Sequence, residues 1–106
     1  MTHKVILHPA AAREAEQAYR YIAQRAPENA SRWYNRLLDA MFSLADFPRR
    51  CPLAPESRYL KREIRHLIHG NYRILYTIEK RTVRILHVRH AAMRPIGEIS
   101  SDLSQE

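Results

Sequence analysis

The chain has 106 residues, 45% of them hydrophobic and 27% charged, so it is long enough for one compact domain and too short for two ordinary ones. No apolar run approaches the roughly 20 residues that a membrane span requires, and Met1–Leu7 is too short and too polar for a secretory signal. The single cysteine, Cys51, excludes a disulfide framework within the monomer, so we expect a protein of the reducing cytoplasm.

The net charge of +7 is unevenly distributed along the chain. Residues 58–95 contain ten Lys and Arg against two Asp and Glu, whereas residues 1–57 contain eight against six. Such a concentration is typical of a surface that meets phosphates or an acidic protein partner, because charge that serves only solubility would mix the two signs. A basic surface with no partner is the alternative.

The first half of the chain predicts a short strand followed by two helices. The apolar run Val5–Leu7 stops at Pro9, which suits a brief strand and a helix that begins near the proline. Apolar residues then recur at steps of three and four over residues 11–26, and again over residues 30–45, as they do in amphipathic helices. Because only a short link around Pro27 separates the two patterns, the helices should pack as an antiparallel hairpin.

The second half predicts a loop and then a three-stranded meander. Three prolines argue against regular structure in residues 47–57. Alternation of apolar and polar residues then predicts strands over residues 63–68, 72–79 and 83–89, which are joined by short polar turns. Consecutive strands with such short connections pair antiparallel.

These elements predict an α+β fold with two layers and the order β-α-α-β-β-β. A helical hairpin should cover one face of a small, mainly antiparallel sheet, while the other face stays open. An open face would let polar strand residues act without disturbing the core. We expect this domain to span residues 1–96, followed by a polar, flexible tail at residues 97–106.

Several kinds of chemistry are unsupported by the sequence. Cys51 stands alone, and the six histidines lack the paired spacings of zinc ligands. With only Gly70 and Gly97 there is no glycine-rich phosphate loop, and no nucleophile elbow is present. We therefore expect neither a metal site nor another cofactor.

Cations inside the predicted strands are the main functional signal. Arg73 lies among apolar neighbours in "YRILY", where a guanidinium is costly to bury unless it binds an anion. A role on a phosphate and a structural ion pair both fit this context. His90 ends the last predicted strand, where an imidazole could exchange protons with a substrate or simply be solvated. Further cations are candidates for binding nucleic acid or another target, with a solvated edge as the alternative: Lys61, Arg62, Arg65, Arg84 and Arg94.

Two stretches resemble a known family. "HGNYRILYTI" (His69–Ile78) and "TVRILHVRHAAMRP" (Thr82–Pro95) are similar to the RelE/ParE superfamily of bacterial type II toxins, also called plasmid stabilisation proteins. The resemblance extends over residues 5–95. It implies a growth-inhibiting toxin that a cognate acidic antitoxin neutralises, as a homodimer or within a toxin–antitoxin heterotetramer.

The resemblance implies two different targets. RelE-like members cleave messenger RNA on the ribosome, and ParE-like members poison DNA gyrase. Arg73 matches the strand arginine of the RNase branch, His90 falls where some of its members carry a histidine, and Arg84 or Arg89 corresponds to a second arginine. In the RNase reading Arg73 and Arg89 stabilise charge in the transition state, and His90 transfers a proton.

The end of the last strand departs from the RNase pattern. Ala91 and Ala92 follow His90, so the catalytic tyrosine of several RNases has no match. The ending "ILHVRHAAMRP" is closer to the leucine-histidine-glycine-arginine-arginine ending of ParE-like members. The sequence therefore leaves open an mRNA endonuclease and a gyrase poison without chemistry of its own. A plain basic nucleic-acid-binding domain or an inactive toxin relic is the remaining alternative.

Overall fold

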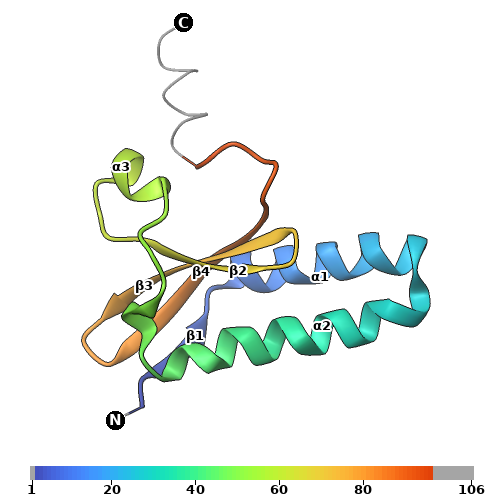
Figure 1. The fold of residues 1–106 in the computed structure, drawn as a ribbon, viewed down its shortest axis with the longest axis horizontal. Coiled ribbons are helices and arrows are strands. Elements are labelled where there is room, and N and C mark those ends of the chain that lie inside the picture. The colour runs from blue at the N-terminus through green and yellow to red at the C-terminus, as the bar shows by residue number, and fades with distance from the viewer. Residues whose placement is uncertain (1, 97–106) are drawn as a thin grey trace, which may run out of the picture.

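The structure, a computed structural model, describes residues 2–96 and shows a helical layer packed on a sheet (Figure 1). The tail expected at residues 97–106 lies outside the described residues. None of the helices in the described part of the chain is long and apolar enough to cross a membrane. In chain order the elements are β1 (Lys4–Leu7), α1 (Pro9–Arg25), α2 (Pro27–Phe42), the 3₁₀ helices η1 (Ser43–Ala45) and η2 (Pro48–Arg50), α3 (Glu56–Leu60), β2 (Arg65–His69), β3 (Tyr72–Glu79) and β4 (Thr82–His90).

The four strands form one sheet in the order β1-β4-β3-β2. Strand β3 pairs antiparallel with β2 and β4, which is the expected meander. Strand β1 pairs parallel to β4, from Lys4 opposite Thr82 to Leu7 opposite Ile85. The first strand of the chain therefore lies beside the last one, and the expected α+β fold class is confirmed.

Helices α1 and α2 run antiparallel and cover one face of the sheet (Figure 1). Helix α1 begins at Pro9, after His8, whose Nδ1 accepts the N–H of Ala10 at 3.0 Å. Alanines on the buried side of α1 allow it to approach β4 closely. The core between the two layers consists of Ala11, Ala15, Leu37, Met41, Leu44, Cys51, Ile74, Tyr76, Val83, Ile85 and Val88.

The opposite face of the sheet is partly covered, so the expectation of an open face was wrong. A second, smaller core on this side contains Ala54, Ile64 and Leu75, and Leu86 and Ile96 pack against it. The apolar side chains of β3 and β4 on this face have to be buried, and α3 with its flanking segments buries them.

The prolines of the predicted loop do not prevent regular structure. Pro48 begins η2, and Pro55 is the residue before α3. Proline is favoured at the first turn of a helix, where its missing N–H has no partner to lose. The expectation of an irregular segment over residues 47–57 was therefore wrong for these two elements.

Strand β4 contains an irregularity that sets the direction of its last residues. Leu75 pairs with His87 and Tyr76 pairs with Ile85, so Leu86 is an extra residue on β4. Such a bulge shifts the alternation of side chains between the two faces. Beyond the bulge, Arg89 lies directly opposite Arg73 on β3.

Candidate functional site

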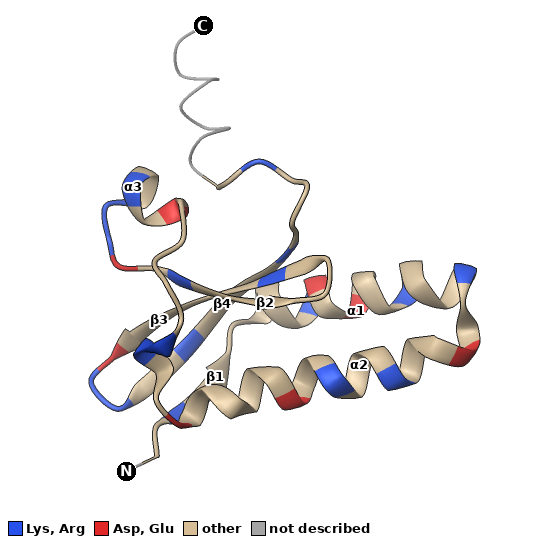
Figure 2. Cartoon of the chain, in the orientation of Figure 1, with Lys and Arg blue, Asp and Glu red and all other residues tan. Residues whose placement is uncertain are grey.

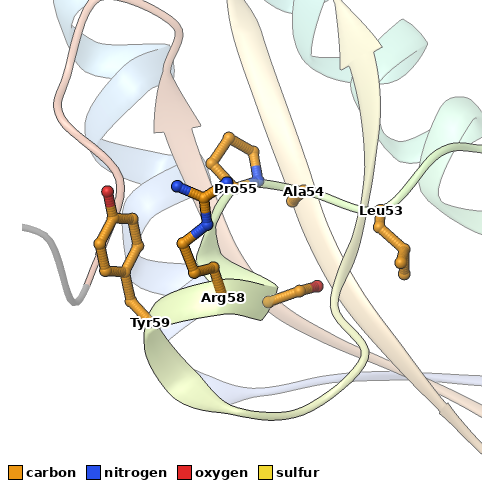
Figure 3. Close-up of a pocket in the computed structure, with 6 residues that line it drawn as sticks. Leu53, Ala54, Pro55, Arg58 and Tyr59 are labelled. Atoms are coloured by element: carbon orange, nitrogen blue, oxygen red, sulfur yellow. The ribbon is translucent and has the colours of Figure 1, made fainter.

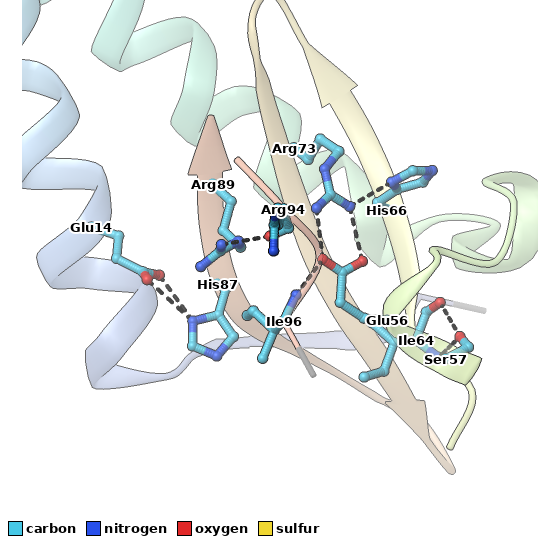
Figure 4. Close-up of polar contacts among 10 residues, drawn as sticks. All are labelled: Glu14, Glu56, Ser57, Ile64, His66, Arg73, His87, Arg89, Arg94 and Ile96. Atoms are coloured by element: carbon cyan, nitrogen blue, oxygen red, sulfur yellow. Dashed lines mark hydrogen bonds and ion pairs between the residues drawn. The ribbon is translucent and has the colours of Figure 1, made fainter. Parts of the chain in front are cut away.

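Arg73 on β3 is buried in an ion pair. Only 7% of its surface is exposed, and its guanidinium donates to both carboxylate oxygens of Glu56, at 3.0 Å to Oε1 and 2.6 Å to Oε2 (Figure 4). Its Nη1 also lies 3.1 Å from Nδ1 of His66. Because a guanidinium has donors and no acceptor, this imidazole nitrogen is the acceptor of the bond. Of the two roles that the sequence left open for Arg73, the structural ion pair is therefore present in the molecule.

The pKa values of Glu56 and His66 are both lowered, but burial acts in opposite directions on the two groups. Burial alone would raise the pKa of Glu56, but the hydrogen bond and charge of Arg73, with the N–H of Ile96, lower it below its usual value. Burial lowers the pKa of His66, and the charge of Arg73 lowers it further against the opposing effect of Glu56. At neutral pH the group is therefore a carboxylate, a guanidinium and a neutral imidazole.

Arg89 and His90 lie at the end of β4. Arg89 donates from Nη2 to the backbone oxygen of Arg94 at 2.8 Å, and its buried Nε has no hydrogen-bond partner within residues 2–96. His90 is exposed; its ring lies edge-on to Tyr72 at 5.2 Å, and its Nδ1 accepts the N–H of Ala92 at 3.0 Å.

The three residues predicted for catalysis divide between the two faces of the sheet. Arg73 and Arg89 are cross-strand partners, whereas His90 is the partner of Tyr72, one position further along each strand. Successive side chains of a strand point to opposite faces, so His90 projects on the side of the helices and Arg73 on the other side, while Arg89 lies beside His90 where β1 no longer pairs with β4. Their catalytic role stays a prediction.

A pocket of about 370 Å³ lies between α1 and the end of β4. Arg89 and His90 line it together with residues of α1, which no sequence pattern connects with the end of β4. Those residues lie on a helix early in the chain, and only the parallel pairing of β1 with β4 brings α1 to this place. The remaining lining residues are Glu14, Gln17, Ala18, Tyr21, Tyr72, Val88 and Met93.

Glu14 connects α1 to β4. Its Oε1 accepts the backbone N–H of Val88 at 3.0 Å, and both of its oxygens lie 3.2 Å from Nδ1 of His87. Burial alone would raise the pKa of Glu14, but the bonds from His87 and Val88 and the charges of His87 and Arg89 lower it. Pairing with β1 ends at Ile85, so this carboxylate takes the place that a further strand residue would have filled.

The other predicted binding cations are spread over the surface. Lys61 and Arg62 are exposed after α3, while Arg65 donates to the backbone oxygen of Cys51 at 2.6 Å. Arg84 forms an ion pair with Glu79 at 2.7 Å near the turn between β3 and β4. Arg94 is exposed and follows the end of β4. The five thus lie on or beside α3, β2 and β4 and do not belong to one element. Figure 2 shows Lys and Arg on both layers and in the connecting segments.

A second pocket, of about 420 Å³, lies beside α3 (Figure 3). Leu53, Ala54, Pro55, Ser57, Arg58 and Tyr59 line it. Arg58 is the one charged residue among them, so this pocket offers less chemistry than the pocket that contains Arg89 and His90. Tyr59 is half-buried among the lining residues.

Comparisons with known proteins agree with this fold. The family model described as the ParE toxin of the type II toxin-antitoxin system, parDE, matches residues 5–95. No curated protein sequence matches the chain significantly. A chain of the chromosomal ParDE system from P. aeruginosa superposes with a TM-score of 0.68 at 12% identity, over 84% of this chain and 96% of that one, which shows a shared fold.

A chain of the RelBE2 toxin–antitoxin complex from Mycobacterium tuberculosis superposes with a TM-score of 0.60 at 26% identity. This match covers 88% of the present chain and 95% of the other. The resemblance noted in the sequence is thereby confirmed. The chain belongs to the ParE toxin family of type II toxin–antitoxin systems, within the RelE/ParE superfamily.

Proposed function

We propose that this toxin arrests growth by binding DNA gyrase, as the ParE-like branch does, and that it has no nuclease chemistry. The observation that carries the proposal is the buried ion pair of Arg73 with Glu56. To reach a scissile phosphate, Arg73 has to leave its carboxylate, and breaking a buried ion pair costs about 3–5 kcal/mol. An arginine held in this way supports a structural role.

The position of His90 supports the same proposal. A nuclease needs its proton-transfer group and its charge-stabilising cations around one phosphate. His90 pairs with Tyr72 and Arg73 pairs with Arg89, so the strand alternation directs the imidazole and the guanidinium of Arg73 to opposite faces. Binding without chemistry does not need the two groups to converge.

The pocket at the end of β4 offers a surface for a protein target. Tyr21 and Met93 are 48% and 51% exposed there, beside the cation of Arg89 and the imidazole of His90. Aromatic residues, methionine and arginine are enriched in protein interfaces and in their energetically important centres.

The proposal includes a cognate antitoxin with an acidic segment, in the cytoplasm. The net charge of +7 and the cations between residues 58 and 95 favour a partner of the opposite sign. Both structural relatives come from toxin–antitoxin systems. An antitoxin that covers the basic surface would keep the toxin from its target.

Ribosome-dependent cleavage of mRNA is the second candidate. It is favoured by the 26% identity with the RelBE2 chain and by the shared pocket of Arg89 and His90. In that case these two residues would carry the reaction, and Arg73 would hold the sheet that positions Arg89.

Two assays with the purified toxin distinguish the candidates. The proposal predicts inhibition of gyrase supercoiling with accumulation of cleaved DNA, and no cut transcript when ribosomes and mRNA are supplied. The variant Arg89→Ala should raise the concentration needed for inhibition by about tenfold or more, as loss of an interface centre does. Arg20→Ala, which removes an exposed cation of α1 outside the pocket, should leave inhibition unchanged. Cleaved mRNA together with undisturbed supercoiling would contradict the proposal.

A further inference from the structure

Phe47, between η1 and η2, combines a strained backbone with an exposed ring. Its φ of 50° lies in the left-handed region, and 82% of its surface is exposed. A phenylalanine in this region lacks the local side-chain hydrogen bond that makes it tolerable for Asn or Asp. Neither the backbone conformation nor the position of the ring is therefore explained by packing within the described residues.

The neighbouring residues fix this conformation from both sides. The guanidinium of Arg50 donates to the backbone oxygens of Asp46, at 2.6 Å, and Phe47, at 3.3 Å, and to the hydroxyl of Ser43 at 2.9 Å. The hydroxyl of the fully buried Tyr76 donates to the backbone oxygen of Pro48. Strain that the surroundings hold in place so firmly is typical of functional sites.

The ring borders a cavity of about 480 Å³, which His3, Asp46, Pro48, Arg49 and Arg50 complete. Three parts of the fold meet at this end of the sheet: the N–H of His3 donates to the oxygen of Ala45, and that of Lys4 to the oxygen of Arg81. A partner that fills the cavity would bury the exposed ring and recover the hydrophobic free energy that the toxin alone forgoes.

The charges around Phe47 favour an acidic protein segment as the occupant. Four cations lie at this end of the sheet: Lys4, Arg49, Lys80 and Arg81. The negative charge of Asp46 opposes them only in part, and the other carboxylate here, that of Glu79, already forms an ion pair with Arg84. Nucleic acid fits less well, because it needs several stacking rings along a cationic groove. Among the residues that line this cavity, Phe47 carries the one phenyl ring, the guanidinium of Arg50 is occupied by backbone oxygens, and Asp46 would repel a phosphate beside the ring.

We propose that Phe47 anchors the acidic segment of the antitoxin, by inserting its ring between apolar side chains of that segment while Arg49 pairs with a carboxylate. This assignment rests on the antitoxin partner of the proposed function. It places an antitoxin contact near the Lys4–Thr82 end of the sheet, whereas the pocket of Arg89 and His90 lies at the other end of β4.

The test is the variant Phe47→Asn, because asparagine accepts the left-handed backbone and removes the ring. Binding is measured by calorimetry with the purified cognate antitoxin. We expect F47N to melt at the temperature of the wild type or above it, to inhibit gyrase as the wild type does, and to bind the antitoxin about tenfold or more weakly. The matched control is Phe42→Asn, which removes a phenylalanine that is 57% exposed at the end of α2 in ordinary helical backbone, with φ of −72°.

Four outcomes separate this inference from the proposed function. Unchanged affinity of F47N would overturn the inference, and so would an equal loss of affinity in F42N. Loss of gyrase inhibition in F47N with antitoxin binding retained would also overturn it, because Phe47 would then contact the target. A wild-type toxin that neither binds the antitoxin nor inhibits gyrase would instead overturn the proposed function.

Discussion

A guanidinium inside a strand can bind a substrate phosphate or a buried carboxylate, and in this structure Arg73 binds the carboxylate of Glu56. The side chains of Arg73 and Glu56 are 8% and 0% exposed, whereas those of the surface pair Arg20 and Glu16 are 71% and 57% exposed. Buried pairs contribute little over an apolar pair but are expensive to break, and exposed pairs contribute little in either case. The two pairs therefore predict very different effects of losing one partner.

The variant Glu56→Ala should lower the free energy of unfolding by about 3–5 kcal/mol, because it leaves the buried guanidinium of Arg73 without its anion. Glu16→Ala, which removes the anion of the exposed pair, should change it by less than about 1 kcal/mol. Urea unfolding at pH 7 measures both values. An E56A protein as stable as the E16A protein would mean that Arg73 does not depend on Glu56.

His66 predicts a dependence of stability on pH. Its folded-state pKa is lower than the usual 6.5, so the unfolded chain binds a proton first as the pH falls. The free energy of unfolding should therefore decrease from pH 7 towards pH 5, and the variant His66→Gln should remove part of this decrease. His69, whose pKa burial and Arg36 also lower, should account for another part. A wild type that is equally stable at both pH values would contradict this assignment.

At the scale of elements, the bulge in β4 and the carboxylate of Glu14 together join α1 to the sheet. The bulge at Leu86 adds a residue to the strand just where pairing with β1 ends, and Glu14 accepts the N–H of Val88 that follows. This contact holds one wall of the pocket against the other. The pocket depends on α1 and β4 keeping their relative position.

Loss of the Glu14 carboxylate should loosen this junction. Glu14→Ala leaves the N–H of Val88 without its acceptor, and we expect the free energy of unfolding to fall by about 1–3 kcal/mol. Hydrogen exchange should show faster exchange at the Val88 amide, while the amides of β2 keep their protection. If the Val88 amide exchanges at its wild-type rate in E14A, the hydrogen bond to Glu14 does not protect this amide.

The elements that the sequence predicted are those with long, regular patterns. The periodicities over residues 11–26 and 30–45 correspond to α1 and α2, and the alternation over residues 72–79 matches β3. Helix α3 has five residues, too few for a helical period to emerge. Its role comes from Glu56, whose partner Arg73 is 17 residues away, and no local pattern indicates a pair at that distance.

The candidate site was predictable only in part for the same reason. His90 was identified from its place at the end of the last strand and Arg89 through the family resemblance, and both line the pocket. Glu14 was absent from the prediction because a glutamate on the polar side of a helix usually faces water. Phe47 was also absent, since a positive φ is rarely expected for a phenylalanine and only the backbone reveals it.

At the scale of the whole molecule, two chemically different surfaces lie at opposite ends of β4. The pocket of Arg89 and His90 lies at one end, and the ring of Phe47 with its surrounding cations lies near the other. At the pocket end, on the strand next to Arg89, the ion pair of Arg73 and Glu56 joins α3 to the sheet. We therefore propose target binding at the pocket end, one anchoring contact of the antitoxin at the Phe47 end, and a stabilising role for the buried pair.

The most direct test of this account is gyrase inhibition by the double variant Arg73→Met with Glu56→Leu. Replacing both charges by apolar side chains removes the guanidinium without leaving a buried charge, so the fold should survive. The account predicts a folded protein, by circular dichroism and thermal melting, that inhibits supercoiling at the same concentrations as the wild type. A folded double variant that no longer inhibits gyrase would contradict it, and so would a wild type that cleaves ribosome-bound mRNA where this variant does not.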